Sequence, residues 1–213
     1  MNENVKWVID TKVKRTMDAL NKNNMGAYYV KNEEDLHKLL SELIPRQQTV
    51  SFGGAMTLFE TNTLDWLRKQ DYNLLDRYKD GLSPQDIKQI YRDAFSADTH
   101  LTSTNAITEN GELYNVDGRG NRVAAMIYGP DQVIVITGTN KIVKDHDEAV
   151  ERNRRMAAPA NVKRLDRKTP CAKVGYCMDC NSPDRICNAF VTISKQLDKD
   201  RIKVIFVEGD YGY

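Results

Sequence analysis

Residues 131–138, DQVIVITG, form the stretch that decides the fold class. Four apolar residues in succession, without polar alternation, are typical of a parallel strand with both faces covered. The runs QTVSF (48–52) and RIKVIFV (201–207) predict two further strands, and AYYV (27–30), YNLLD (72–76) and ADTHLT (97–102) predict shorter ones. The sequence therefore predicts a sheet with several mainly parallel strands.

Segments with helical periodicity alternate with these strands. Apolar residues recur at helical spacing from Val5 to Leu20, and Gly26 is expected to cap that helix. The spacing of Thr57 and Glu60 predicts a capping box that opens a helix through Leu67. Three other residues are expected to be N-caps: Asn32 before 33–44, Ser83 before 84–94 and Asp145 before 146–156. The alternation predicts an α/β domain with helices on both faces of the sheet.

One antiparallel excursion is expected within this domain, at residues 105–116. Two β-prone runs there flank Asn110-Gly111, a dipeptide that accepts positive φ at both central positions of a turn. The sequence therefore predicts a β-hairpin with its tip at Glu109–Gly111.

Composition limits the class of protein. The chain has 213 residues, 40% of them hydrophobic, which suits a single domain over 1–213 with its own core and a helical segment over 1–45. The net charge of +1 gives no overall field for nucleic acid or an anionic membrane. No signal-peptide pattern and no run of about 18 apolar residues occurs, so we expect a cytoplasmic protein.

All four cysteines lie within a loop-like region at 160–190: Cys171, Cys177, Cys180 and Cys187. The Cys-x-x-Cys step lets two sulfurs turn toward one metal, and in a reducing compartment thiols so close rarely form disulfides. The spacing fits tetrahedral zinc and a [4Fe–4S] cluster equally well. Reduced structural thiols or redox-active thiols are the alternative.

Two glycine-bearing turns are candidate sites. Gly53 and Gly54 follow a strand and precede a helix, where backbone N–H groups can hold a carboxylate or phosphate. At the hairpin tip, Glu109 either is solvated or points into a cleft beside the amide of Asn105. Arg122 and Lys141 fall at strand-to-helix turns, where each can pair with a substrate carboxylate or serve in a surface ion pair.

The order VSFGGAMTL, then residues 97–143, ADTHLTSTNAITENGELYNVDGRGNRVAAMIYGPDQVIVITGTNKIV, then SPDRICN resembles the lactate-utilisation (LUD) domain family. The resemblance spans nearly the whole chain. It implies a three-layer α/β/α sandwich similar to the sugar-phosphate isomerase, glucosamine-phosphate deaminase and coenzyme A transferase group, here with a C-terminal cysteine-rich loop. Coenzyme A transferases carry a catalytic glutamate in a Glu-Asn-Gly turn, which makes Glu109 a candidate catalytic residue.

The resemblance also implies a role in oxidising L-lactate to pyruvate, together with iron–sulfur partner subunits. No G-x-G-x-x-G fingerprint follows a strand, so the chain is not expected to be a self-sufficient dehydrogenase. We expect a complex subunit or a homo-oligomer that binds a small carboxylate or phosphorylated ligand. The alternative is a non-redox enzyme or ligand-binding protein of this fold with a structural zinc.

Overall fold

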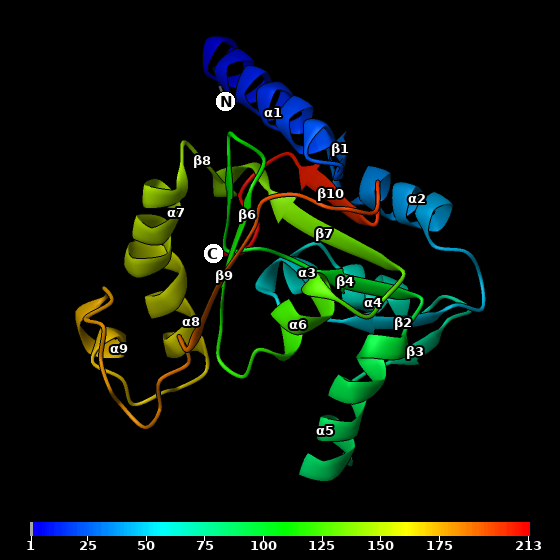
Figure 1. Cartoon of the computed structure of the whole chain (residues 1–213), viewed down its shortest axis with the longest axis vertical. Coiled ribbons are helices and arrows are strands. Elements are labelled where there is room, and N and C mark those ends of the chain that lie inside the picture. Colours follow the sequence, from blue (N-terminus) through cyan, green and yellow to red (C-terminus); the bar gives the residue numbers. More distant parts are fainter. Residues whose placement is uncertain (1) are drawn as a thin grey trace.

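A computed structural model describes residues 2–213. Its centre is a six-stranded, entirely parallel sheet in the order β1-β10-β7-β4-β2-β3 (Figure 1). The strands are β1 (Gly26–Val30), β2 (Thr49–Phe52), β3 (Asn73–Leu75), β4 (Thr99–Thr102), β7 (Gln132–Gly138) and β10 (Ile202–Val207). All six strands were predicted from the sequence.

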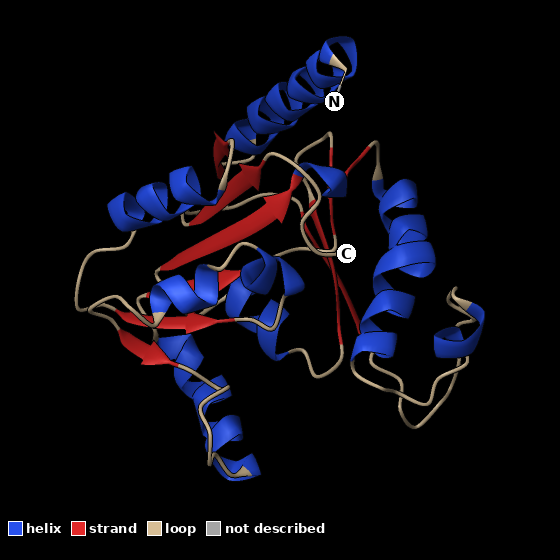
Figure 2. Ribbon diagram, turned by 180° about the vertical axis from the view of Figure 1, so that it is seen from behind, coloured by secondary structure: helices blue, strands red, loops and turns tan. Residues whose placement is uncertain are grey.

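A second, four-stranded sheet stands beside the first, in the order β8-β5-β6-β9. It contains β5 (Ala106–Thr108), β6 (Leu113–Asp117), β8 (Ile142–Val143) and β9 (Ala189–Ile193). The predicted hairpin is the β5–β6 pair, but β8 and β9 extend it, so the antiparallel excursion is a sheet of its own (Figure 2). At the hairpin tip only Gly111 has a positive φ, 77°, so the prediction of positive φ at both turn residues was wrong for Asn110.

Helices connect and cover the sheets. They are α1 (Glu3–Lys22), α2 (Glu33–Leu43), α3 (Met56–Glu60), α4 (Thr63–Leu67), α5 (Pro84–Asp93), α6 (Asn121–Ile127), α7 (His146–Arg152), α8 (Ala158–Arg164) and α9 (Cys171–Val174). Short 3₁₀ turns occupy Ala94–Ser96 and Thr139–Lys141, and a π-helical turn, Asn153–Ala157, joins α7 to α8. The caps Asn32, Ser83 and Asp145 are confirmed, since each side chain accepts a backbone N–H of the first turn.

Two predicted helix boundaries were wrong. Gly26 begins β1, and α1 ends earlier, at Lys22. Asn23 is its C-cap, and the φ of 61° at Asn24 ends the helical conformation. Thr57 does not cap a helix, because it lies inside α3 and its hydroxyl contacts Nζ of Lys141. The predicted long helix is also broken into α3 and α4 at Asn62, whose φ is 51°.

The hydrophobic core explains why β7 lacks polar alternation. Ile134 and Ile136 pack on one side of the sheet with buried residues of α2, α3 and α4. Val133 and Val135 pack on the other side with α1, α6 and the second sheet. Helix α7 covers the far side of the second sheet through Ala149. The parallel sheet is therefore covered on both faces, as in a three-layer α/β/α sandwich. No helix in the described part of the chain is long and apolar enough to cross a membrane.

Candidate functional site

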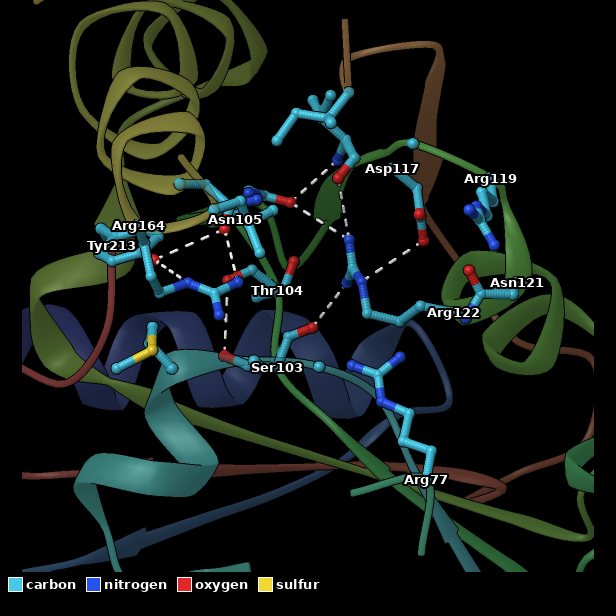
Figure 3. A pocket seen from close by; sticks show the side chains of 18 of the residues that line it. Arg77, Ser103, Thr104, Asn105, Asp117, Arg119, Asn121, Arg122, Arg164 and Tyr213 are labelled. Carbon is cyan, nitrogen blue, oxygen red and sulfur yellow. Dashed lines mark hydrogen bonds and ion pairs between the residues drawn. The ribbon is translucent and has the colours of Figure 1, made fainter. Parts of the chain in front are cut away.

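A cavity of about 460 Å³ opens at the carboxyl edge of the parallel sheet. Its polar wall comes from residues that directly follow adjacent strands: Gly54 after β2, Arg77 after β3, Ser103, Thr104 and Asn105 after β4, and Lys141 after β7. Ligands of open parallel α/β sheets bind at this edge, because the connections there are free to carry side chains that the sheet itself cannot. Figure 3 shows the labelled residues around the cavity.

The charge of the cavity is one-sided. Its lining contains five basic residues and a single acid, Asp117; the basic residues are Arg77, Arg119, Arg122, Lys141 and Arg164. Basic groups gathered in a cleft with low-dielectric walls create a strong local potential even where the whole chain is nearly neutral. The cavity is therefore suited to a small anion.

Arg122, at the start of α6, fastens the two sheets together. Its Nη1 donates to the carbonyl of Ser103 at 2.8 Å and to Oδ1 of Asn115 at 2.7 Å. Its Nη2 donates to the carbonyl of Val116 at 3.1 Å and to Oδ1 of Asn105 at 3.3 Å (Figure 3). Nε lies 3.6 Å from Asp117. All four Nη hydrogens therefore face protein acceptors, and Arg122 gives a ligand charge rather than hydrogen bonds.

Lys141 ends the 3₁₀ turn after β7 and is almost completely buried, with 2% of its surface exposed. Its Nζ lies 2.9 Å from Oγ1 of Thr57, 3.2 Å from Oγ of Ser103 and 3.3 Å from the carbonyl of Thr104. All three partners are uncharged. Burial, with the repulsion of Arg152 and Arg122, lowers the pKa of Lys141 to about 7.

Gly54 makes room for Arg77. A Cβ at Gly54 would stand 1.8 Å from Nη2 of Arg77, so any side chain would displace the guanidinium. Arg77 donates from Nη1 to the hydroxyl of Tyr91 at 3.1 Å and from Nη2 to that of Tyr78 at 2.7 Å. A guanidinium has five N–H groups, so Arg77, unlike Arg122, keeps donors for a ligand.

The outer wall of the cavity is made by the end of α8 and by Tyr213. Nε of Arg164 donates to the hydroxyl of Tyr213 at 2.6 Å, and Nη2 donates to Oδ1 of Asn161 at 2.8 Å. Arg164 and Arg119 are exposed side chains on opposite parts of the lining. They supply charge at the rim rather than buried contacts.

Two residues predicted for the site lie outside the cavity. Glu109 pairs with Arg15 of α1, at 2.8 Å, on the side of the hairpin that faces away from the cavity lining. The cause is the short turn, which directs its tip toward the end of α1: a Cβ on Gly111 would stand 2.7 Å from the backbone nitrogen of Leu20. Of the two interpretations of Glu109, its placement agrees with the hairpin tip and not with a position in the cavity beside Asn105.

Gly53 is the second of these residues. It packs against Oγ1 of Thr102 and the side chain of Arg122, which a Cβ would approach at 2.9 Å and 3.0 Å. Its N–H donates to the carbonyl of Leu101, so it is not directed at a ligand. Of the predicted substrate-binding residues, the structure brings together Gly54, Asn105, Arg122 and Lys141.

The four cysteines lie in a separate place, on the loop beyond α8 that lies at one side of the molecule in Figure 1. Cys171 is buried in α9, and the other three are partly exposed. Burial, together with the neighbouring Cys177 and Cys171, raises the pKa of the Cys187 thiol to about 11. Cys177 and Cys187 line a second cavity of about 380 Å³ with Tyr114 and His146.

The cysteine loop (residues 165–188) contains ligands of the type that a metal centre needs, but their side chains are not gathered around one point. Four thiols are a suitable donor set for zinc or an iron–sulfur cluster, and the N–H of Asp179 donates to Sγ of Cys177 at 3.4 Å. Arg185 braces the loop by donating to the carbonyls of Cys180 and Cys187. Within residues 2–213, however, no three His, Cys, Asp or Glu side chains stand together as a metal site.

Several lining residues were not predicted from the sequence: Arg77, Ser103, Thr104, Asp117, Arg119, Arg164 and Tyr213. A positional signal exists for Arg77, Ser103 and Thr104, because each follows a predicted strand and so belongs to the carboxyl edge. Arg119, Arg164 and Tyr213 carry no such signal, since they reach the cavity from elements whose placement depends on tertiary packing.

The fold and the cavity define a class of protein: a parallel α/β domain with a cationic cavity of about 460 Å³ at its carboxyl edge. The chain belongs to the LUD domain family, whose sequence profile matches residues 13–207. This membership supports a role related to lactate utilisation.

A solved structure supports the fold. A DUF162 family protein from Deinococcus radiodurans superposes with a TM-score of 0.56 at 16% identity, covering 94% of this chain and 98% of that one. The beta subunit of eIF2B from Chaetomium thermophilum matches with a TM-score of only 0.39 at 13% identity, over 55% of this chain and 44% of that one. None of the curated proteins matches the chain.

Proposed function

We propose that this protein binds a small anionic substrate in the carboxyl-edge cavity and serves as a subunit in the oxidation of L-lactate to pyruvate. The single observation that supports the proposal is the charge of the cavity, with five basic residues and one acid in its lining. A carboxylate entering it gains charge-assisted hydrogen bonds, which are about twice as strong as neutral ones.

The geometry suggests how a 2-hydroxy or 2-oxo carboxylate would lie. Arg77 has spare donors for the carboxylate, and Ser103 and Lys141 are the polar groups of the cavity nearest the end of β4 and β7. Oδ1 of Asn105 accepts hydrogen bonds from Arg122 and from the N–H of Val116. The amide nitrogen of Asn105 therefore points away from these two partners. These groups bind and orient a substrate, and electrons must be carried by another component.

A second candidate function is favoured by the size of the cavity and its number of charges. A volume of about 460 Å³ is within the range of sites for ligands larger than lactate, and four arginines exceed the need of one carboxylate. A phosphorylated ligand, such as a sugar phosphate, would use more of them. This is the non-redox alternative, in which the chain binds or converts a sugar phosphate or acyl group.

For the redox function we propose iron–sulfur partner subunits in the cytoplasm as the electron carriers. The cysteine loop stays a predicted metal site in this proposal, for a [4Fe–4S] cluster or for zinc. Tyr176 and Met178 of the loop are exposed apolar side chains, so a partner subunit can reach the loop from solvent.

The function is tested by calorimetric titration of the protein with L-lactate, pyruvate, inorganic phosphate and glucose 6-phosphate. Arg77→Met should weaken anion binding by about 10- to 100-fold, the value of one charge-assisted hydrogen bond. Glu109→Gln, outside the cavity, should bind like the wild type. The proposal is contradicted if none of these anions binds, or if Arg77→Met binds them with the same affinity as the wild type. Tighter binding of glucose 6-phosphate than of lactate or pyruvate would favour the second candidate.

The metal prediction is tested by anaerobic purification, metal analysis and an absorption spectrum. About four irons and a brown colour are expected for the cluster, and about one zinc with no colour for the alternative. Cys180→Ser should lower the metal content, because a metal held by four thiolates loses one ligand. The cysteines are not ligands if the protein contains no metal, or if Cys180→Ser leaves the metal content unchanged.

A further inference from the structure

Lys141 has surroundings that an ordinary structural lysine lacks. It is buried at the carboxyl edge and lines the cavity, and no carboxylate of residues 2–213 pairs with it. Buried lysines are normally paired, because an isolated ammonium costs several kcal/mol to bury. The cationic form of Lys141 therefore gains little from its surroundings.

The neutral amine is correspondingly favoured. Arg152 and Arg122 act on Lys141 with like charge, and among the described residues 2–213 Glu60 is the only acid that opposes them. With its pKa lowered from 10.5 to about 7, Lys141 is far more often neutral at neutral pH than an exposed lysine. Amines desolvated and placed next to cationic groups in this way are the nucleophiles that form Schiff bases with carbonyl substrates.

Two hydroxyl groups stand where proton transfer to and from this amine is needed. Oγ1 of Thr57 and Oγ of Ser103 each contact Nζ, and they lie 3.2 Å from one another. Only Ser103 of the pair also lines the cavity. A proton can therefore pass between Nζ and a group bound in the cavity through one hydroxyl.

We propose that Lys141 forms a covalent imine with the carbonyl carbon of a short 2-oxo acid, of the pyruvate class, bound in the cavity. The proposal rests on the anion-binding function above and names the reactive group of the same site. It distinguishes the oxidised from the reduced form of the ligand, because the hydroxyl-bearing carbon of a 2-hydroxy acid is not electrophilic.

The reaction is balanced without a further reactant. The lone pair of Nζ attacks the carbonyl carbon, and the C=O π electrons move to the oxygen, which receives a proton from Nζ through Ser103. The remaining proton on Nζ of the carbinolamine then passes, through Ser103, to the hydroxyl, which leaves as water while the nitrogen lone pair forms the C=N bond. Hydrolysis by the same water reverses the sequence. No atom is oxidised or reduced.

The test is reductive trapping in the full-length protein. The protein is incubated with pyruvate and sodium cyanoborohydride, which converts an imine into a stable secondary amine, and is then analysed by intact mass and peptide mapping. One added group per chain is expected, with occupancy at Lys141 at least about tenfold above that at exposed lysines, which are almost fully protonated at neutral pH. Mapping of the wild type assigns the residue without any variant.

Two matched variants complete the experiment. Lys141→Arg keeps the charge but cannot form an imine, and it should lose the adduct; circular dichroism checks its fold. Lys144→Arg, three residues away with 82% of its side chain exposed, should be labelled like the wild type. The imine is refuted if Lys141 is unlabelled or labelled no more than Lys144.

Parallel calorimetry separates this proposal from the proposed function. If L-lactate and pyruvate both bind but Lys141 carries no adduct, anion binding stands and the imine does not. If no anion binds and no adduct forms, both are wrong. An adduct at Lys141 in protein that shows no reversible binding of L-lactate would support the imine and contradict the lactate-oxidation role.

Discussion

Replacing Arg122 with methionine should lower the free energy of unfolding by about 3–5 kcal/mol, the cost of removing one partner from a buried, hydrogen-bonded charge pair. The change removes the donors of four acceptors, which are the carbonyls of Ser103 and Val116 and the side chains of Asn105 and Asn115. It also leaves Asp117, 11% exposed, without its partner. The methionine chain replaces most of the packing, so the loss measures mainly the polar contacts.

Arg119→Met is the matched control for this measurement. Arg119 lines the same cavity but is exposed, and exposed substitutions usually change stability by less than about 0.5 kcal/mol. Urea unfolding followed by circular dichroism gives both values. Equal losses in the two variants would show that Arg122 does not fasten the sheets.

The affinity of the cavity for L-lactate should fall by about tenfold between pH 6 and pH 8.5, because Lys141 with its pKa of about 7 loses its charge in this range. The lactate carboxylate stays ionised throughout, and the arginines around Lys141 stay protonated. Affinity is therefore highest below the pKa of Lys141 and is lost as the pH rises through it.

Lys141→Met provides the comparison, because it keeps the length of the side chain and removes the titrating group. Its affinity for L-lactate should be lower and nearly independent of pH over the same range. Calorimetry at several pH values measures this, and an equally steep decline in Lys141→Met would assign the pH dependence to another group.

The lowered pKa of Lys141 also affects the free energy of unfolding, which changes with pH in the opposite direction to the affinity for L-lactate. The folded pKa of about 7 lies below the value of about 10.4 expected for an unfolded lysine, so the unfolded chain binds more protons between these limits. The contribution of Lys141 to stability therefore rises with pH across this window. It is least favourable below pH 7, where the buried amine must also be charged.

The fold was largely predictable because its signals are local. The continuous apolar run of β7 indicates burial on both faces, and Ser83 and Asp145 cap helices through contacts within four residues. The second sheet was not predictable in full, since β8 is two residues long and β9 pairs with β6 across more than seventy residues of chain. Such pairings depend on tertiary packing rather than on the propensity of the segment.

The site was predictable where the chain leaves a strand and not elsewhere. Gly54 and Lys141 follow β2 and β7, and the carboxyl-edge rule applies to both. Glu109 follows β5 of the second sheet, but only the other end of that strand, which Asn105 precedes, borders the cavity. Arg77 follows a strand of only three residues, and its role depends on two tyrosine hydroxyls and on the space left by Gly54.

The short connections between the two sheets have a consequence for binding. The chain passes from β4 to β5 through Ser103–Asn105 and from β7 to β8 through Thr139–Lys141. Each connection has three residues, so this part of the cavity wall consists of short segments held at both ends by strands. A ligand that contacts these segments immobilises little of the protein backbone. The conformational entropy that the protein loses on binding is mainly that of exposed side chains such as Arg119 and Arg164. The short, rigid connections therefore select ligands by shape, and the mobile arginine side chains at the rim adjust to the position of the ligand's charge.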